Sequence, residues 1–194
     1  WTKSPALADF PLRSQTPWLR MTSLSCRCGQ SRLTLSGPPI LTADCCCDSC
    51  ARAAARLEAL PGAPRITDDL GATPFVLYRK DRVRFETTAP PRSFRLSSDA
   101  KTRRLLAPCC NTPLGLEFSG GHWISLYAAL WPVGTAPKAT LRTMTGDRPD
   151  RGSLPGDIPN ARSQSPGFIW ALLTAWIAMG FRAPKIATEG EVDA

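Results

Sequence analysis

Residues 45–50 read Cys-Cys-Cys-Asp-Ser-Cys and hold four of the eight cysteines of the chain within six positions. The other four cysteines form two more clusters, Cys26-Arg27-Cys28 and Cys109-Cys110. Zinc sites take four tetrahedral ligands, which are commonly thiolates supplied in close pairs from distant parts of a chain. The three clusters therefore predict thiolate-rich metal sites, with zinc as the metal, in a reduced and cytoplasmic protein.

Two other uses of the cysteines stay open. Neighbouring thiols seldom reach disulfide geometry with each other, but pairing between clusters would give disulfides. Against a secreted protein, residues 1–20 carry charges throughout and lack the continuous apolar run of a signal peptide. Iron–sulfur clusters also take thiolates, although the cysteine spacing of ferredoxins is absent.

The length of 194 residues corresponds to one domain, or to one domain and a tail. Hydrophobic residues make up 43% of the chain and charged residues 21%, which excludes a disordered or collagen-like protein. We expect five segments along the chain: an N-terminal extension, disordered or foreign to the natural chain, over 1–20; a zinc-binding domain over 21–133; a Pro/Gly-rich linker or loop over 134–166; an apolar helix over 167–182; and a tail over 183–194.

Short apolar stretches separated by turn residues predict a mainly β domain with short helices. Strands are expected over 31–35, 75–78, 83–85, 93–96 and 123–127, with those at 75–78 and 83–85 paired as a hairpin around Lys80-Asp81. Asp48 and Ser49 can cap a short Ala-rich helix from Cys50 to Leu60. The lone His122 is expected in a surface turn, with an acid/base role as the alternative.

The segment from Phe168 to Phe181 is uncharged but spans only about 14 residues, whereas a transmembrane helix needs roughly 20. We therefore expect a C-terminal apolar helix that packs on the domain or joins two copies in a homodimer. A membrane-associated segment is the alternative.

Basic residues are concentrated between Arg79 and Arg104, where nine basic residues stand against three acidic ones. Arg82, Arg84 and Arg95 alternate with apolar residues, so we expect their side chains on the outer face of a sheet. Arginine forks suit carboxylates, and such a face also suits a nucleic-acid backbone. No nucleic-acid-binding motif accompanies the stretch, which counts against specific recognition of nucleic acid.

Three motifs together resemble the glutathione-dependent formaldehyde-activating enzyme family, which includes S-(hydroxymethyl)glutathione synthase and centromere protein V. They are Cys26-Arg27-Cys28-Gly29, the run at 45–50, and Cys110-Asn111-Thr112-Pro113-Leu114. The pattern of the family is C-x-C-G, then C-H-C-x-x-C, then F-C-x-x-C-G-T-P-L. The resemblance covers roughly residues 22–130, with the order and spacing matched.

This resemblance implies a zinc-binding β-tent fold with two zinc sites and a carbon–sulfur lyase activity on glutathione–aldehyde adducts. Cys26, Cys28 and Cys110 would be structural ligands, whereas the catalytic set would be Cys45, Cys47 and Cys50. Three ligands leave a fourth position open for water or a substrate thiolate. Glutathione would be the co-substrate, with its carboxylates bound by Arg82 and Arg84.

The chain also departs from the family pattern. Cys46 replaces the middle histidine, and Ala107 replaces the first cysteine of the last C-x-x-C, so either Cys109 or Cys46 would complete the structural site. Asn111 replaces a glycine, and asparagine can adopt the same left-handed backbone. Of two arginines that commonly follow the middle motif, Arg52 alone remains. The alternative function is a non-catalytic, zinc-stabilised binding module that uses its basic face on an anionic partner.

Overall fold

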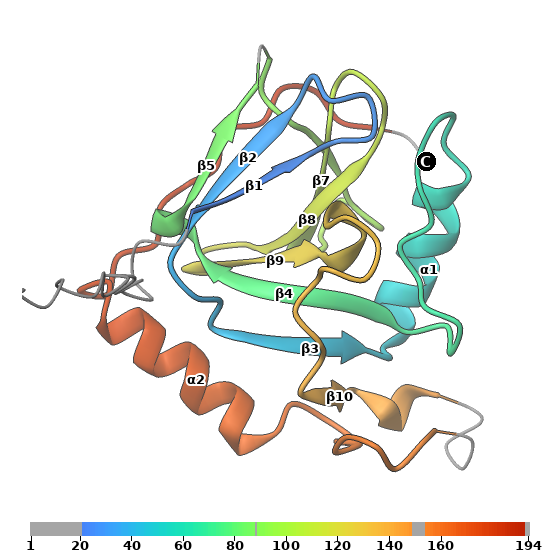
Figure 1. Ribbon diagram of the computed structural model, residues 1–194, viewed down its shortest axis with the longest axis vertical. Coiled ribbons are helices and arrows are strands. Elements are labelled where there is room, and N and C mark those ends of the chain that lie inside the picture. Colours follow the sequence, from blue (N-terminus) through green and yellow to red (C-terminus); the bar gives the residue numbers. More distant parts are fainter. Residues whose placement is uncertain (1–20, 88, 149–153, 193–194) are drawn as a thin grey trace, which may run out of the picture.

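The computed structural model describes residues 21–87, 89–148 and 154–192, so the extension expected over residues 1–20 lies outside the described part. Within these residues, ten strands form two sheets, and two α-helices cover part of the larger one (Figure 1). The predicted mainly β fold with short helices is therefore confirmed. None of the described helices is both long enough and apolar enough to cross a bilayer.

The larger sheet has seven strands in the order β10-β3-β4-β9-β8-β7-β6. All its neighbouring strands are antiparallel except β10 and β3, which run parallel. Its strands are β3 (Leu41–Cys45), β4 (Thr73–Arg79), β6 (Arg92–Phe94), β7 (Thr102–Leu106), β8 (Pro113–Phe118), β9 (Trp123–Tyr127) and β10 (Leu141–Thr143). The segment expected to be a linker or loop, 134–166, thus contributes a strand to this sheet.

The smaller sheet consists of β1 (Met21–Ser25), β2 (Arg32–Ser36) and β5 (Val83–Glu86), in that order. The hairpin predicted between the strands at 75–78 and 83–85 is wrong, because β4 and β5 belong to different sheets. Both edges of β4 are already paired, with β3 and with β9, so no edge is left for β5. A 3-10 turn at Lys80–Arg82 carries the chain to the small sheet, where β5 pairs with β2.

Strand β4 separates two hydrophobic cores, since successive side chains of a strand point to opposite faces. Phe75 and Leu77 belong to one core, which α1 and α2 cover. Val76 and Tyr78 belong to the other, which lies between the two sheets and includes leucines of β1 and β2. Each buried aliphatic or aromatic side chain contributes about 1.5–3 kcal/mol, so the sheets are held together mainly by this second core.

Helix α1 (Asp48–Glu58) confirms the short helix predicted after the triple cysteine, but the predicted cap is wrong: Cys47 is the N-cap, and Asp48 and Ser49 lie in the first turn of the helix. Its buried residues recur with helical spacing and face the first core: Cys50, Ala53, Ala54 and Leu57. The small alanines let the helix backbone approach the sheet closely. The helix ends at Glu58, shortly before Pro61-Gly62, a pair that cannot continue it.

Helix α2 (Pro166–Ile177) lies against the same core through Phe168 and Leu172. The hydroxyl of Ser165 caps it by accepting a hydrogen bond from the amide of Phe168 at 3.2 Å. Large apolar side chains on α2 and just beyond it remain exposed: Ile169, Trp170, Leu173, Trp176, Ile177 and Phe181. The homodimer expected through residues 167–182 stays a prediction.

His122 connects α2 to the sheet. The prediction that it lies in a surface turn is wrong. The side chain is buried, and its Nε2 forms a 2.8 Å hydrogen bond with the carbonyl oxygen of Leu172. Its ring stacks on Trp176 with 5.4 Å between the ring centroids. The tail is also docked, because Glu191 forms a β-bridge with Ser93 and Val192 is buried in the first core.

Candidate metal centres

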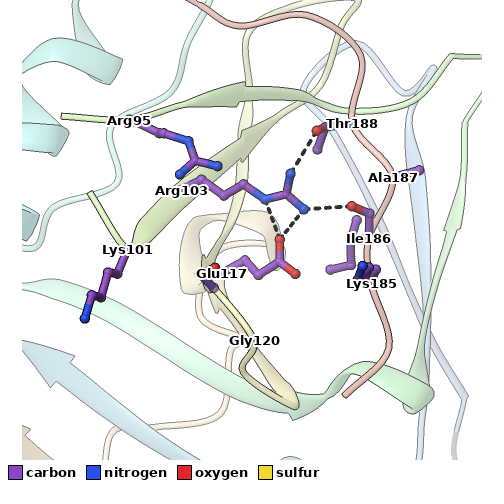
Figure 2. Close-up of a pocket in the computed structure, with 10 residues that line it drawn as sticks. Arg95, Lys101, Arg103, Glu117, Gly120, Lys185, Ile186, Ala187 and Thr188 are labelled. Carbon is purple, nitrogen blue, oxygen red and sulfur yellow. Dashed lines mark hydrogen bonds and ion pairs between the residues drawn. The ribbon is translucent and has the colours of Figure 1, made fainter. Parts of the chain in front are cut away.

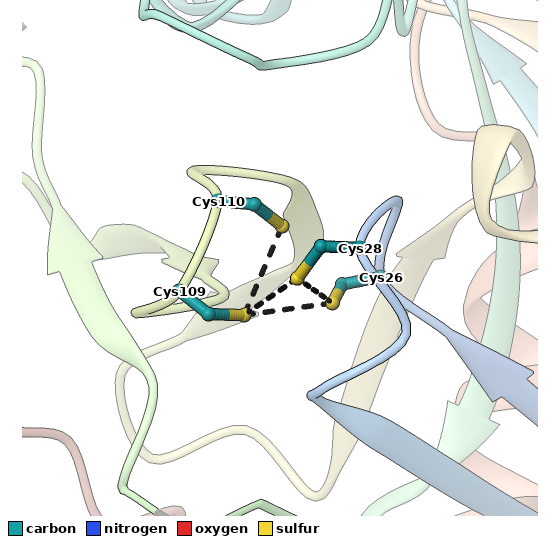
Figure 3. Close-up of side chains that lie close together, drawn as sticks. All are labelled: Cys26, Cys28, Cys109 and Cys110. Carbon is teal, nitrogen blue, oxygen red and sulfur yellow. Dashed lines mark hydrogen bonds between the residues drawn. The ribbon is translucent and has the colours of Figure 1, made fainter.

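Two loops from distant parts of the chain bring four thiol sulfurs together (Figure 3). Cys26 and Cys28 lie in the β1–β2 connection, and Cys109 and Cys110 lie in the β7–β8 connection. We call these residues the four-sulfur group. The sulfur of Cys109 lies 3.6 Å from that of Cys26, 3.3 Å from that of Cys28 and 3.8 Å from that of Cys110.

These separations fit a tetrahedral zinc ion. Zinc–sulfur bonds are about 2.3 Å long, so the sulfurs of a tetrahedral site lie about 3.8 Å apart. The six sulfur pairs all lie within 4.8 Å, and the four pairs with hydrogen-bond contact lie between 3.3 and 3.8 Å. All eight cysteines of the chain are free thiols rather than disulfides. The donor set and its size therefore fit a structural zinc site.

Both loops have the backbone turns that this arrangement requires. Gly29 has a φ of +79°, and Asn111 has a φ of +57°, so asparagine does adopt the left-handed conformation expected of it. The backbone amide of Arg27 donates a 3.1 Å hydrogen bond to the Thr112 hydroxyl, which joins the two loops directly. Burial raises the pKa of Cys110, but hydrogen bonds from Thr112 and Cys28 outweigh it and lower the pKa to about 6.

Cys109, and not Cys46, completes the four-sulfur group. Cys46 belongs to neither sulfur group of the described residues, so its expected role as an alternative ligand is not supported. The reason is position: Cys46 precedes the start of α1, whereas Asn111, next to Cys110, hydrogen-bonds with the carbonyl of Pro61 beyond the other end of that helix. Cys46 is buried, which raises the pKa of its thiol.

The second site is the three-sulfur group, formed by Cys45, Cys47 and Cys50, whose sulfurs lie within 4.8 Å of one another. Cys45 ends β3, Cys47 is the N-cap of α1, and Cys50 lies in its first turn. The sulfur of Cys47 lies 3.5 Å from that of Cys45 and accepts a 3.3 Å hydrogen bond from the backbone amide of Cys50. No fourth His, Cys, Asp or Glu among the described residues joins this group.

Cys47 is the most acidic thiol of this group. Hydrogen bonds from the thiols of Cys45 and Cys50 lower its pKa to about 3, and the amide of Cys50 and the charge of Arg104 add to the effect. Burial acts in the opposite direction. The pKa of Cys45 is raised, first by its hydrogen bond to Cys47. Without metal, the negative charge therefore rests on Cys47, at the helix end where the macrodipole favours an anion.

A pocket of about 470 Å³ adjoins the three-sulfur group at Cys47. Its inner wall includes Ser49 and Arg104, and its rim includes exposed Arg52. The remaining lining residues come from the helix start, the 96–102 segment and the turn after β10: Asp48, Leu96, Ser97, Ala100, Thr102, Met144 and Asp147. The loop from β6 to β7, rather than the predicted basic sheet face, thus forms one side of the pocket.

Arg82 and Arg84 do not lie at this pocket. Cys45 pairs with Thr73 at one end of β4, and Arg79 ends that strand six residues further on, about 20 Å away at roughly 3.3 Å per residue. Arg82 follows beyond that end and donates a 3.5 Å hydrogen bond to the carbonyl of Pro38. The structure therefore separates the two arginines from the three-sulfur group, and the arginines that line the adjoining pocket are Arg52 and Arg104.

The basic stretch is also not a single outer face. Lys80 is buried, and its ammonium lies 2.5 Å from a carboxylate oxygen of Glu117. The other oxygen of Glu117 accepts from the Arg103 guanidinium at 2.6 Å, as Figure 2 shows in a second pocket, of about 530 Å³. Arg104 is only 1% exposed. Lys80 and Arg104 thus lie in the protein interior, whereas Arg84 is exposed.

No protein-family model matches the chain, and no curated protein matches it. The fold and the site together define a mainly β protein with two groups of cysteines that could each hold a metal ion, one with four sulfurs and one with three.

Proposed function

We propose that this protein is a zinc-dependent carbon–sulfur lyase that acts on adducts of glutathione with an aldehyde such as formaldehyde. The unequal number of ligands in the two sulfur groups carries the proposal. Four sulfurs complete a tetrahedral zinc site, whereas three leave one position for a further ligand. The group of three also adjoins a pocket large enough for a small molecule.

The chemistry requires a thiol, an aldehyde and control of one proton. In the joining direction, a sulfur lone pair forms the carbon–sulfur bond while the carbonyl oxygen takes the proton that the thiol gives up; the reverse direction breaks that bond. Zinc held by three thiolates would lower the pKa of a thiol at the open position. Cys45, Cys47 and Cys50 would hold the metal, and Arg52 at the rim would bind a glutathione carboxylate.

The proposal includes the zinc-binding β-tent fold and the relationship to the formaldehyde-activating family. It is supported by the two sheets, by the meeting of the first and last cysteine motifs in space, and by the left-handed Asn111. Free thiols in both groups agree with a cytoplasmic protein that encounters glutathione.

Alanine variants of the three-sulfur group test the proposal. Cys45→Ala, Cys47→Ala and Cys50→Ala should each fold, hold one zinc instead of two, and lose any acceleration of exchange between formaldehyde and its glutathione adduct in magnetisation-exchange NMR. Cys46→Ala is the matched control, because this neighbouring thiol lies outside both groups. It should keep two zinc ions and the exchange activity.

Native protein that holds two zinc ions but neither accelerates exchange nor binds glutathione would contradict the proposed reaction. The non-catalytic, zinc-stabilised binding module would then be the better account of the protein. If the three alanine variants unfold, the three-sulfur group is structural and the proposal of an open metal position fails.

A further inference from the structure

Arg104 is a buried cation without an acidic partner. Its side chain is 1% exposed, and its Nη2 donates hydrogen bonds to the carbonyl of Ser49 at 3.2 Å and to the Ser49 hydroxyl at 3.0 Å. Nη1 donates to the Thr102 hydroxyl at 3.5 Å, and Nε has no partner. Among the residues that the structure describes, no carboxylate lies within ion-pair distance of this guanidinium.

A buried charge is costly unless a charge of opposite sign or a full set of hydrogen bonds accompanies it. The adjacent Arg103 meets this requirement through Glu117, at 2.6 Å. Asp48 and Asp147 also line the pocket beside Arg104, but both are exposed, where water screens their charge. The partner of Arg104 is therefore to be sought inside the pocket, where the three-sulfur group lies.

The charges of the three-sulfur group match that of Arg104. The guanidinium and Cys47 line the same pocket, and the guanidinium donates to Ser49, which lies between Cys47 and Cys50 in the chain. Three thiolates around a divalent zinc ion carry one net negative charge, which one guanidinium neutralises. An anionic fourth ligand would add a second negative charge, so Arg104 would offset one of two, and without Arg104 both would stand uncompensated beside the pocket.

We propose that Arg104 is the fixed counter-charge of the three-sulfur metal site, and that it makes the fourth position select a thiolate over a neutral ligand. This inference rests on the proposed function and adds to it the ionic state in which the substrate thiol binds. Arg104 acts here as a positioning and specificity residue, since it lies in the inner wall of the pocket rather than among the metal ligands.

The test measures ligand selectivity instead of turnover. Cobalt(II) is substituted into the protein, and binding of 2-mercaptoethanol and of imidazole is followed in the absorption bands of the cobalt. In Arg104→Gln, the affinity for 2-mercaptoethanol should fall about tenfold or more, because a nearby charge is lost. The affinity for neutral imidazole should change less than about twofold. Arg104→Lys should restore most of the thiol affinity, and Arg84→Gln, at an exposed arginine, should change neither.

Equal loss of both ligands in Arg104→Gln, or no loss of either, would overturn the inference. If circular dichroism shows that Arg104→Gln does not fold, the native protein still decides: it must prefer 2-mercaptoethanol to imidazole, and equal binding contradicts the inference. Native protein that takes up cobalt only at the four-sulfur group overturns the proposed function as well. If the native protein binds two metal ions but shows no preference between 2-mercaptoethanol and imidazole, only this inference is overturned.

Discussion

Replacing Cys109 with serine removes one ligand of the four-sulfur group at little other cost, because Cys109 is exposed. Structural zinc contributes about 10–16 kcal/mol of binding free energy, so one of four ligands corresponds to about 3 kcal/mol. In a domain of this size, 1 kcal/mol shifts the melting temperature by about 2–4 °C. We therefore expect the Tm of Cys109→Ser to fall by about 6–12 °C, as measured by circular dichroism.

Cys46→Ser is the matched control, since Cys46 is a buried thiol outside both sulfur groups. Its free energy of unfolding should fall by only about 1 kcal/mol, which is the ordinary effect of a single substitution. A strong zinc chelator separates the two effects. With chelator present, native protein and Cys109→Ser should melt together because neither retains the metal, whereas the deficit of Cys46→Ser should persist.

The reasoning would be refuted if Cys109→Ser melted within about 2 °C of the native protein while the native protein responded to chelator. It would also be refuted if Cys46→Ser, rather than Cys109→Ser, lost the response to chelator. That result would make Cys46 the fourth ligand, contrary to the geometry.

At Asn111, glycine should cost about 1–2 kcal/mol in urea unfolding, because it loses the side-chain hydrogen bonds with Arg92 and with the carbonyl of Pro61. Valine should cost about 1–2 kcal/mol more, because a β-branched residue also resists the positive φ; equal costs would contradict this. For His122, burial lowers the pKa below its value in the unfolded chain. Below about pH 6.5 the unfolded chain takes up the proton first, so native stability falls with pH, and the advantage of native protein over His122→Gln should shrink from about pH 7.5 to 5.5. A constant advantage would refute this. Arg52→Gln should weaken glutathione binding in calorimetry about tenfold, and Arg84→Gln should not.

The sulfur groups could be predicted because metal ligands occur in pairs that are close in sequence. The spacing of Cys26 and Cys28, and of Cys45, Cys47 and Cys50, carries that information directly. The choice between Cys46 and Cys109 does not follow from spacing. It depends on the tertiary fold, which places Cys46 before the start of α1 and the loop of Cys109 and Cys110 beyond the end of that helix.

Long-range pairing accounts for the features that the sequence did not predict. The pattern of β4 and β5 is that of a hairpin, but distant strands β3 and β9 occupy both edges of β4. Arg104 lies in a stretch rich in basic residues, and this local pattern predicts a solvent-exposed side chain rather than a buried one. Its Nη2 donates hydrogen bonds to Ser49 at the start of α1, 55 positions earlier in the chain. His122 is covered by α2, whose Leu172 lies 50 positions later.

The four-sulfur group joins Cys26 to Cys109, which are 83 positions apart in the chain. A metal bound by both loops therefore acts as a reversible cross-link. For comparison, a disulfide that closes a loop of about 100 residues removes about 4.7 kcal/mol of conformational entropy from the unfolded chain. Non-local contacts of this kind are slow to form, because loop closure precedes any gain from them. Zinc that binds early in refolding would hold the small sheet beside β7 and β8 while the remaining contacts form. The rate of refolding should therefore rise with the zinc concentration.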